Sequence, residues 1–164
     1  MSVRALQAAL FVIVAASVPV AALAVPRAGE AAPGFALKRV DTNAVQTLAA
    51  LKGKPVYLVF FASWCGPCND EAPSVVKLAA KYRPRGLVTL GVSELDQHPK
   101  TLEFLKKYGI RYEVVVDDDG TMGKYYGALG LPVHVFIDRK GTISTYRLGE
   151  MSPGEIDDAI KKII

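Results

Sequence analysis

Apolar runs alternate with helically spaced apolar positions along most of this chain. The runs at 56–61, 87–92 and 114–116 are nearly all apolar and rich in β-branched or aromatic residues. Runs of this length are typical of parallel strands that are covered on both faces of a sheet. The sequence therefore predicts three buried strands in one sheet.

Three further segments have the spacing of amphipathic helices. The first follows 56–61 directly and should end at Pro84 and Gly86, and the second should end at Gly109. The last opens at Ser152–Glu155 with an N-cap serine, a proline and a capping-box glutamate. The expected inner faces are Val75, Leu78, Ala79 and Tyr82; Leu102, Leu105 and Tyr108, with Phe104 beside them; and Ile156, Ala159, Ile160 and Ile163.

Two strand pairs flank this alternating region. The pieces at 35–40 and 45–48 are separated by the turn sequence Asp41–Thr42–Asn43. Strand-like runs at 133–138 and 143–147 are separated by a second turn sequence. Strands that alternate with helices require a mostly parallel sheet, and the terminal hairpin adds an antiparallel edge. We expect an α/β fold with a central mixed sheet flanked by helices.

The first 24 residues differ in composition from the rest. Arg4 is the only charge before Arg27, and the apolar stretch ends in the small-x-small sequence Ala22–Leu23–Ala24. Residues 1–24 are therefore interpreted either as a cleaved signal peptide or as a membrane anchor formed by residues 5–25. Both alternatives place the rest of the chain outside the cytoplasm, in the periplasm or cell envelope, because Arg4 holds the N-terminus inside. Residues 25–34 are predicted to be a linker and residues 35–164 one domain.

The charge and the cysteine content exclude several classes of function. The net charge of +4 is spread over scattered lysines and arginines, so a nucleic-acid partner is not expected. The only two cysteines, Cys65 and Cys68, are three positions apart, which is a site rather than a disulfide scaffold. A structural zinc site needs four ligands, and the remaining His98 and His134 lie in separate elements. We therefore expect no metal at the cysteine pair.

The predicted elements place Cys65 where a buried strand meets a helix. Unpaired N–H groups and the positive end of the helix dipole favour a thiolate there over a thiol, whose ordinary pKa is about 8.5. Cys65 is therefore expected to attack, and Cys68, one turn further and more enclosed, to resolve the mixed disulfide. The redox-active pair then needs no other cofactor.

The sequence Trp64–Cys65–Gly66–Pro67–Cys68 resembles the thioredoxin active site. A longer ordered pattern resembles the extracytoplasmic TlpA/ResA/CcmG-type thiol–disulfide oxidoreductases, from about Ala32 to the C-terminus. This resemblance implies a thioredoxin fold with an N-terminal β-hairpin extension. The pattern comprises Ala32–Pro33–Gly34–Phe35, Phe60–Phe61–Ala62–Ser63, Glu71, Pro73, Gly127, Gly130–Leu131–Pro132, Phe136–Ile137–Asp138 and Gly141.

The same resemblance suggests roles for residues around the cysteines. It implies a cis Leu131–Pro132 peptide opposite the pair, where the Leu131 backbone can pair with an extended substrate. Trp64, Gly66 and Pro67 would complete the substrate-binding surface. Glu71 matches a glutamate of the family and is expected to accept the proton of Cys68; the alternative is a solvated helix glutamate. Cytoplasmic thioredoxin instead has a buried aspartate six residues before its first cysteine, where Val59 stands here.

The other polar positions near these motifs are not assigned to the site. His134 alternates with two valines and is expected to be a lone buried histidine without partners. Asn69 and Asp70 are expected on the helix surface. Asp117–Asp119 lacks the spacing of a calcium loop and is interpreted as a turn.

The leading functional hypothesis is a reductant of disulfides in exported proteins. The family suggests the cysteine pairs of apocytochrome c or of copper proteins as targets, with a membrane electron donor upstream because the compartment is oxidising. A dithiol oxidase or isomerase is the first alternative, since C-x-x-C proteins differ widely in potential. A Cu(I) chaperone is the second, because two thiolates suit Cu(I). A peroxidase is disfavoured by the cysteine pair itself.

Overall fold

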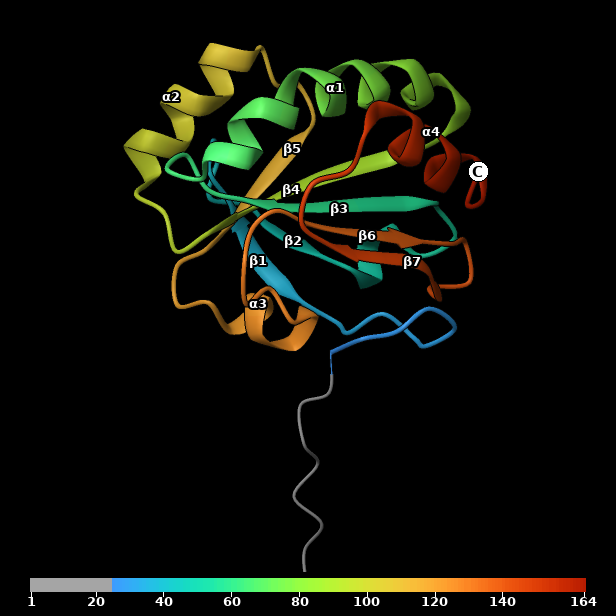
Figure 1. The fold of residues 1–164 in the computed structure, drawn as a ribbon. Helices are drawn as coiled ribbons and strands as arrows, with labels where there is room; N and C mark the ends of the chain where they lie inside the picture. Colours follow the sequence, from blue (N-terminus) through green and yellow to red (C-terminus); the bar gives the residue numbers. More distant parts are fainter. Residues whose placement is uncertain (1–24) are drawn as a thin grey trace, which may run out of the picture.

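The computed structural model describes residues 25–164, so the predicted signal or anchor at 1–24 lies outside the described residues. A seven-stranded sheet runs through the body in the order β2-β1-β5-β4-β3-β6-β7. Helices α1, α2 and α4 cover one face and α3 covers the other (Figure 1). The strands are β1 (Ala36–Arg39), β2 (Val45–Thr47), β3 (Val56–Phe61), β4 (Val88–Glu94), β5 (Glu113–Asp117), β6 (Val133–Ile137) and β7 (Ile143–Leu148). The helices are α1 (Gly66–Tyr82), α2 (His98–Tyr108), α3 (Thr121–Tyr126) and α4 (Pro153–Lys161), with short 3-10 turns η1 (Ala49–Leu51) and η2 (Arg83–Arg85).

The mixed sheet confirms the predicted fold class. Strand β3 pairs in parallel with β4 and antiparallel with β6, and β4 pairs in parallel with β5. The N-terminal hairpin of β1 and β2 joins the sheet through antiparallel pairing of β1 with β5. All six residues of β3 are buried, as its continuous apolar sequence predicts for a strand covered on both faces. The carboxyl end of this strand delivers the chain to the cysteine pair.

Each face of the sheet has its own core. Leu58 and Phe60 of β3 point to the face covered by α3, where they pack with Tyr126. Tyr57 and Val59 point to the opposite face, where they pack with residues of α1 and α4. Because successive side chains of a strand point to opposite faces, the apolar residues of β3 contribute alternately to the two cores.

Two features differ from the predicted pattern. Helix α3 was not expected, because its six residues are too few for a periodic signal and lie between Gly120 and Gly127. In α2 the buried residues are Thr101 and Phe104, whereas Leu102 is exposed. The predicted stripe of this helix was therefore wrong at Leu102. Phe104 of this helix packs against Phe61 of β3, with ring centroids 4.9 Å apart.

The predicted helix ends agree with the structure. In the α4 capping box, Ser152 Oγ accepts a hydrogen bond from Glu155 N, and Glu155 Oε2 accepts one from Ser152 N. Helix α1 continues through Pro73 to Tyr82. Helix α2 ends at Gly109, which has a φ of 62° that L-residues with a side chain rarely adopt.

The segment from Val25 to Gly34, predicted to be a linker, contacts the sheet over part of its length. Gly29 N donates to Ile143 O, and Ala31 forms an antiparallel bridge with Thr142. Within residues 25–164, no helix has the length and apolarity needed to cross a membrane.

Candidate active site

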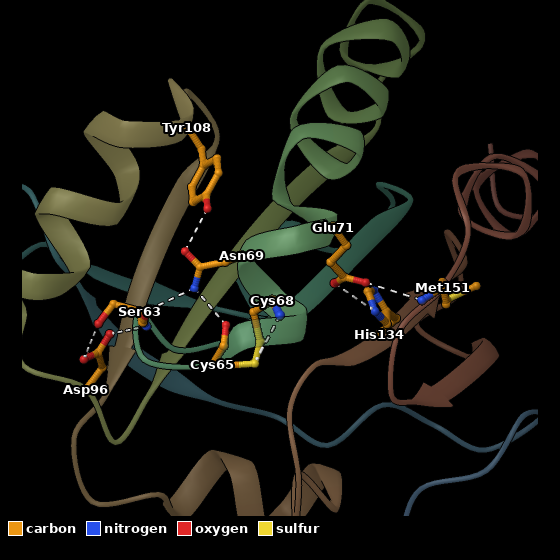
Figure 2. The surroundings of a disulfide bond; sticks show 9 residues. All are labelled: Ser63, Cys65, Cys68, Asn69, Glu71, Asp96, Tyr108, His134 and Met151. Atoms are coloured by element: carbon orange, nitrogen blue, oxygen red, sulfur yellow. Dashed lines mark hydrogen bonds and ion pairs between the residues drawn. A yellow bond between two sulfur atoms is a disulfide. The ribbon is translucent and has the colours of Figure 1, made fainter.

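The two cysteines lie at the junction of β3 and α1. Cys65 is the N-cap of α1, Gly66 and Pro67 begin the helix, and Cys68 follows in its first turn. Cys65 and Cys68 form a disulfide, with a Cα–Cα distance of 5.3 Å, and both are buried. Cys68 N lies 3.2 Å from Cys65 Sγ and donates to it (Figure 2). An N–H of the first helical turn thus faces the Cys65 sulfur, and such a donor stabilises a thiolate.

The loop before Cys65 is held by side chains from two other elements. Asp96, just after β4, accepts hydrogen bonds from Ser63 N at 2.7 Å and from Ser63 Oγ at 3.0 Å. Asn69 Nδ2 donates to Ser63 O and to Cys65 O, and Asn69 Oδ1 accepts from Tyr108 at 2.8 Å (Figure 2). Asn69 is half-buried, so the predicted surface position holds only in part, and its amide joins α1 to α2 and to the cysteine loop. No periodic signal reveals such a bridge.

The loop before β6 lies against the cysteines. The Leu131–Pro132 peptide is cis, as the family resemblance implied. Leu131 is partly buried and packs against the cluster that contains Cys65, Cys68 and Ala72. Trp64, next to Cys65, is 64% exposed. Residues from β3, α1 and the β6 loop thus surround one face of the pair, while their roles in substrate binding remain a prediction.

Glu71 is buried, which excludes the alternative of a solvated helix residue. It is 8% exposed and lies one helical turn after Cys68. Its Oε1 is 3.2 Å from His134 Nε2, and its Oε2 accepts from Met151 N at 3.4 Å (Figure 2). The expectation that His134 lacks partners was therefore wrong. His134 Nδ1 also lies 2.8 Å from the hydroxyl of Tyr57, and only the tertiary fold brings these three residues together.

A pair of acidic side chains is buried at the ends of β4 and β5. Glu94 and Asp117 are register partners, 5% and 0% exposed, and Asp117 Oδ2 accepts from Gly123 N. Burial and the neighbouring charge of Asp117 raise the pKa of Glu94 to about 8. Asp117, predicted to be part of a turn, is instead the last residue of β5, whereas Asp118 and Asp119 are exposed turn residues.

Between residues 25 and 164, no three or more His, Cys, Asp and Glu side chains are grouped as ligands for a metal ion. His98 pairs with Asp118, and His134 lies in the buried group with Glu71. The reactive groups that the structure places together at the start of α1 are the two sulfur atoms. A cysteine pair that closes into a disulfide at a helix N-terminus exchanges disulfides with other thiols, so the class of protein is a thiol–disulfide oxidoreductase.

Comparison with known proteins identifies the family. The chain belongs to the AhpC/TSA family, whose model matches residues 28–146. It is 32% identical over 137 residues to the thiol-disulfide oxidoreductase ResA of Bacillus thuringiensis subsp. konkukian, covering 82% of this chain and 78% of that protein. ResA of Bacillus subtilis is 31% identical over 136 residues, covering 82% and 75%.

Solved structures show the same thioredoxin fold. A putative thiol:disulfide interchange protein DsbE from Chlorobium tepidum superposes with a TM-score of 0.76 at 29% identity, covering 84% of this chain and 98% of that one. DsbF of Mycobacterium tuberculosis superposes with a TM-score of 0.74 at 31% identity, covering 79% and 95%. A related Mycobacterium tuberculosis disulfide oxidoreductase is described as secreted; it has a TM-score of 0.71 at 27% identity, covering 78% and 95%. These likenesses agree with the resemblance of the sequence to TlpA/ResA/CcmG-type proteins.

Proposed function

We propose that this protein reduces disulfides of exported proteins on the outer side of a membrane. The observation that supports this proposal best is the position of Cys65. Its sulfur accepts a hydrogen bond from the backbone N–H of Cys68 in the first turn of α1. Such a sulfur is a good nucleophile and a good leaving group, because its thiolate is stabilised. The Gly66–Pro67 pair between the cysteines resembles that of reducing members of the thioredoxin superfamily.

In the proposed reaction the reduced Cys65 thiolate attacks one sulfur of a target disulfide. A mixed disulfide forms, and the other target sulfur leaves as a thiolate that takes up a proton. Cys68 then loses its proton, with Glu71 as the acceptor, and attacks the Cys65 sulfur. The second target thiol is released, the Cys65–Cys68 disulfide closes, and two electrons have passed to the target.

The target is proposed to bind at the protein surface next to the cysteine pair. Trp64 offers an open apolar surface, and Leu131 packs beside the sulfurs from the opposite loop. Gly66 and Pro67, the first two residues of α1, have no large side chain that would block access to Cys65. Pro132 would complete the surface from the loop before β6. An extended cysteine-containing segment, such as that of an apocytochrome c or a copper protein, suits this surface.

The proposed function requires export of the domain and a source of electrons for its cysteine pair. Residues 1–24 would direct the domain out of the cytoplasm, either as a cleaved signal or as an anchor. Because an extracytoplasmic compartment is oxidising, a membrane protein must return the disulfide to the dithiol. The ResA and DsbE relatives support the general assignment to disulfide exchange with other proteins.

A trapping experiment in cells tests the proposal. Cys68→Ala leaves the mixed disulfide unresolved, so we expect envelope proteins with paired cysteines to be captured on Cys65. The matched Cys65→Ala variant keeps one cysteine and should capture nothing. Capture by Cys65→Ala instead would reverse the assigned roles of the two sulfurs.

A measurement of the reduction potential against glutathione tests the direction. A reductant should have a potential near that of thioredoxin, about −270 mV. A potential near about −120 mV would contradict the reductant proposal and favour a dithiol oxidase. Copper titration of the reduced protein, compared with insulin-disulfide reduction, tests the Cu(I) chaperone alternative, which requires tight binding and no reduction of insulin.

A further inference from the structure

A group of three buried polar side chains lies behind the cysteine pair, on the face of the sheet covered by α1 and α4. Tyr57 of β3 and His134 of β6 are both 0% exposed, and Glu71 of α1 is 8% exposed. The hydroxyl of Tyr57 is 2.8 Å from His134 Nδ1, and His134 Nε2 is 3.2 Å from Glu71 Oε1. Figure 2 shows the imidazole and the Glu71 carboxylate directed at one another.

The Tyr57 hydroxyl determines which nitrogen of His134 carries the proton. Burial, the charge of Glu71 and the nearby Tyr112 raise the pKa of Tyr57 well above its ordinary value, so the phenol keeps its proton. A buried hydroxyl proton needs an acceptor, and His134 Nδ1 is the partner found at 2.8 Å. A neutral His134 therefore carries its proton on Nε2, the nitrogen beside Glu71.

The contact between His134 and Glu71 is close but not aligned as a hydrogen bond. Within the described residues His134 Nε2 has no partner that meets hydrogen-bond geometry, although the Glu71 carboxylate is 3.2 Å away. The second oxygen of Glu71 is held by the backbone N–H of Met151. Glu71 thus accepts one hydrogen bond from outside its own helix, and the His134 imidazole lies in contact with its other oxygen.

Few other ionisable groups face this cluster. Helix α1 contributes Cys68, one turn before Glu71, and the segment before β5 contributes Tyr112, which interacts with the charge of Glu71. On β7 the register partner of His134 is Arg147, whose exposed guanidinium lies 3.8 Å from Glu155 of α4. Glu71 therefore has His134 in contact with its carboxylate and Cys68 one helical turn away on its own helix.

We propose that His134 is a positioning residue that acts through Glu71 on the proton of Cys68. This inference rests on the dithiol exchange proposed above. When the mixed disulfide on Cys65 is resolved, the Cys68 proton passes to the Glu71 carboxylate, and the Cys68 thiolate attacks the Cys65 sulfur. The imidazole N–H holds the carboxylate in place and ready to accept that proton. Tyr57 fixes the required tautomer from the other side of the ring.

Ellman's reagent, 5,5′-dithiobis(2-nitrobenzoate), separates the two steps in the purified, reduced protein. Attack by the Cys65 thiolate releases one thionitrobenzoate and leaves the other bonded to Cys65 as a mixed disulfide. Attack by Cys68 on the Cys65 sulfur releases the second thionitrobenzoate and closes the disulfide. The first phase depends on reagent concentration and the second does not, so stopped-flow absorbance measures resolution alone.

The variants His134→Leu, His134→Gln and Glu71→Gln test the proposed connection. At pH 7, His134→Leu is expected to slow the second phase by about tenfold, which lies below the range typical of loss of a complete general base. The first phase should change by less than about twofold, because Cys65 is activated by the helix N-terminus. His134→Gln keeps an N–H donor and should recover most of the lost rate.

The double variant shows whether His134 works through Glu71. If it does, adding His134→Leu to Glu71→Gln produces no further slowing, since the two side chains then serve one step. In all the slowed variants the second phase should recover as the pH approaches about 8.5, where an ordinary thiol ionises without help. Ile160→Val, another buried position on the same face, should lower the urea midpoint without changing the second phase.

Three outcomes would overturn the inference. They are a second phase in His134→Leu equal to that of the wild type at every pH, full additivity with Glu71→Gln, and an equal slowing of both phases. A wild-type protein that releases only one thionitrobenzoate would instead refute the dithiol exchange, and the proposed function with it. The two failures are therefore distinguishable in one experiment.

Discussion

Glu94 and Asp117 form a buried carboxyl pair whose titration should be visible in the stability of the whole protein. Glu94 ends β4 and Asp117 ends β5, and the two strands place them side by side. Glu94 Oε2 and Asp117 Oδ1 are buried without hydrogen-bond partners among the described residues. Two carboxylates in such a place repel each other and lose hydration, so one of them is expected to keep a proton at neutral pH.

The pH range and the sign of the effect follow from the pKa of Glu94. Its ordinary value is 4.5, and the folded protein raises it to about 8. Between these two pH values the folded state binds more protons than the unfolded state. Stability should therefore fall as the pH rises from about 4.5 to about 8 and should then level off with respect to this group. Lys124 opposes part of the shift.

The size of the stability change follows from the same shift in the pKa of Glu94. A difference of about 3.5 pH units corresponds to about 5 kcal/mol if the unfolded residue titrates normally. Exposed turn residues adjoin the pair, so water can relax part of the charge. We expect a loss of about 2 to 5 kcal/mol between pH 5 and pH 9, a large fraction of the stability of a domain of this size.

Urea unfolding of the wild type and of Glu94→Gln, measured from pH 5 to pH 9, tests this prediction. The glutamine side chain is neutral at every pH, so the variant should be close to the wild type at pH 5 and more stable at pH 9. Glu103→Gln, on the exposed side of α2, removes one negative charge without touching the pair and should leave the pH dependence unchanged. Equal slopes for the wild type and Glu94→Gln would refute the argument.

Two further predictions concern the surroundings of the same strand ends. Asp96→Ala removes the acceptor of two hydrogen bonds from Ser63, so we expect a loss of about 1 to 3 kcal/mol in urea unfolding and faster amide exchange at Ser63. Unchanged exchange at Ser63 would show that the loop before Cys65 is held by other contacts. Gly123→Ala places a methyl group against the Glu94 carboxylate, so it should destabilise the fold by about 1 to 3 kcal/mol. Gly154→Ala, where the added carbon meets no neighbour, is the matched control; an equal effect of both would refute the steric argument.

Local sequence signals predicted the features that depend on neighbouring residues. The continuous apolar run of β3 predicted a strand buried on both faces, and the Ser152–Glu155 pattern predicted the start of α4. The order of elements placed Cys65 at a helix N-terminus, which is where the structure has it. The same signals were silent on α3, since six residues between two glycines give no periodicity.

The local sequence signals did not predict the polar contacts around the site. Asn69 looked like any exposed helix residue, but Tyr108, 39 positions later, donates to its side chain. His134 looked like a lone buried histidine, but Glu71 and Tyr57 meet it from two other elements. Such pairings depend on which strands become neighbours, and many sequences with the same hydrophobic pattern would place different side chains there.

By itself, the sequence determined the class of chemistry and the local setting of the reactive sulfur. Two cysteines separated by Gly66–Pro67 at a strand-to-helix junction need only local geometry to become a redox pair. Only the tertiary structure decided how Glu71 is held and which neighbours raise the pKa of Glu94. Burial and electrostatic neighbours set those properties, and both arise when distant segments pack together and exclude water.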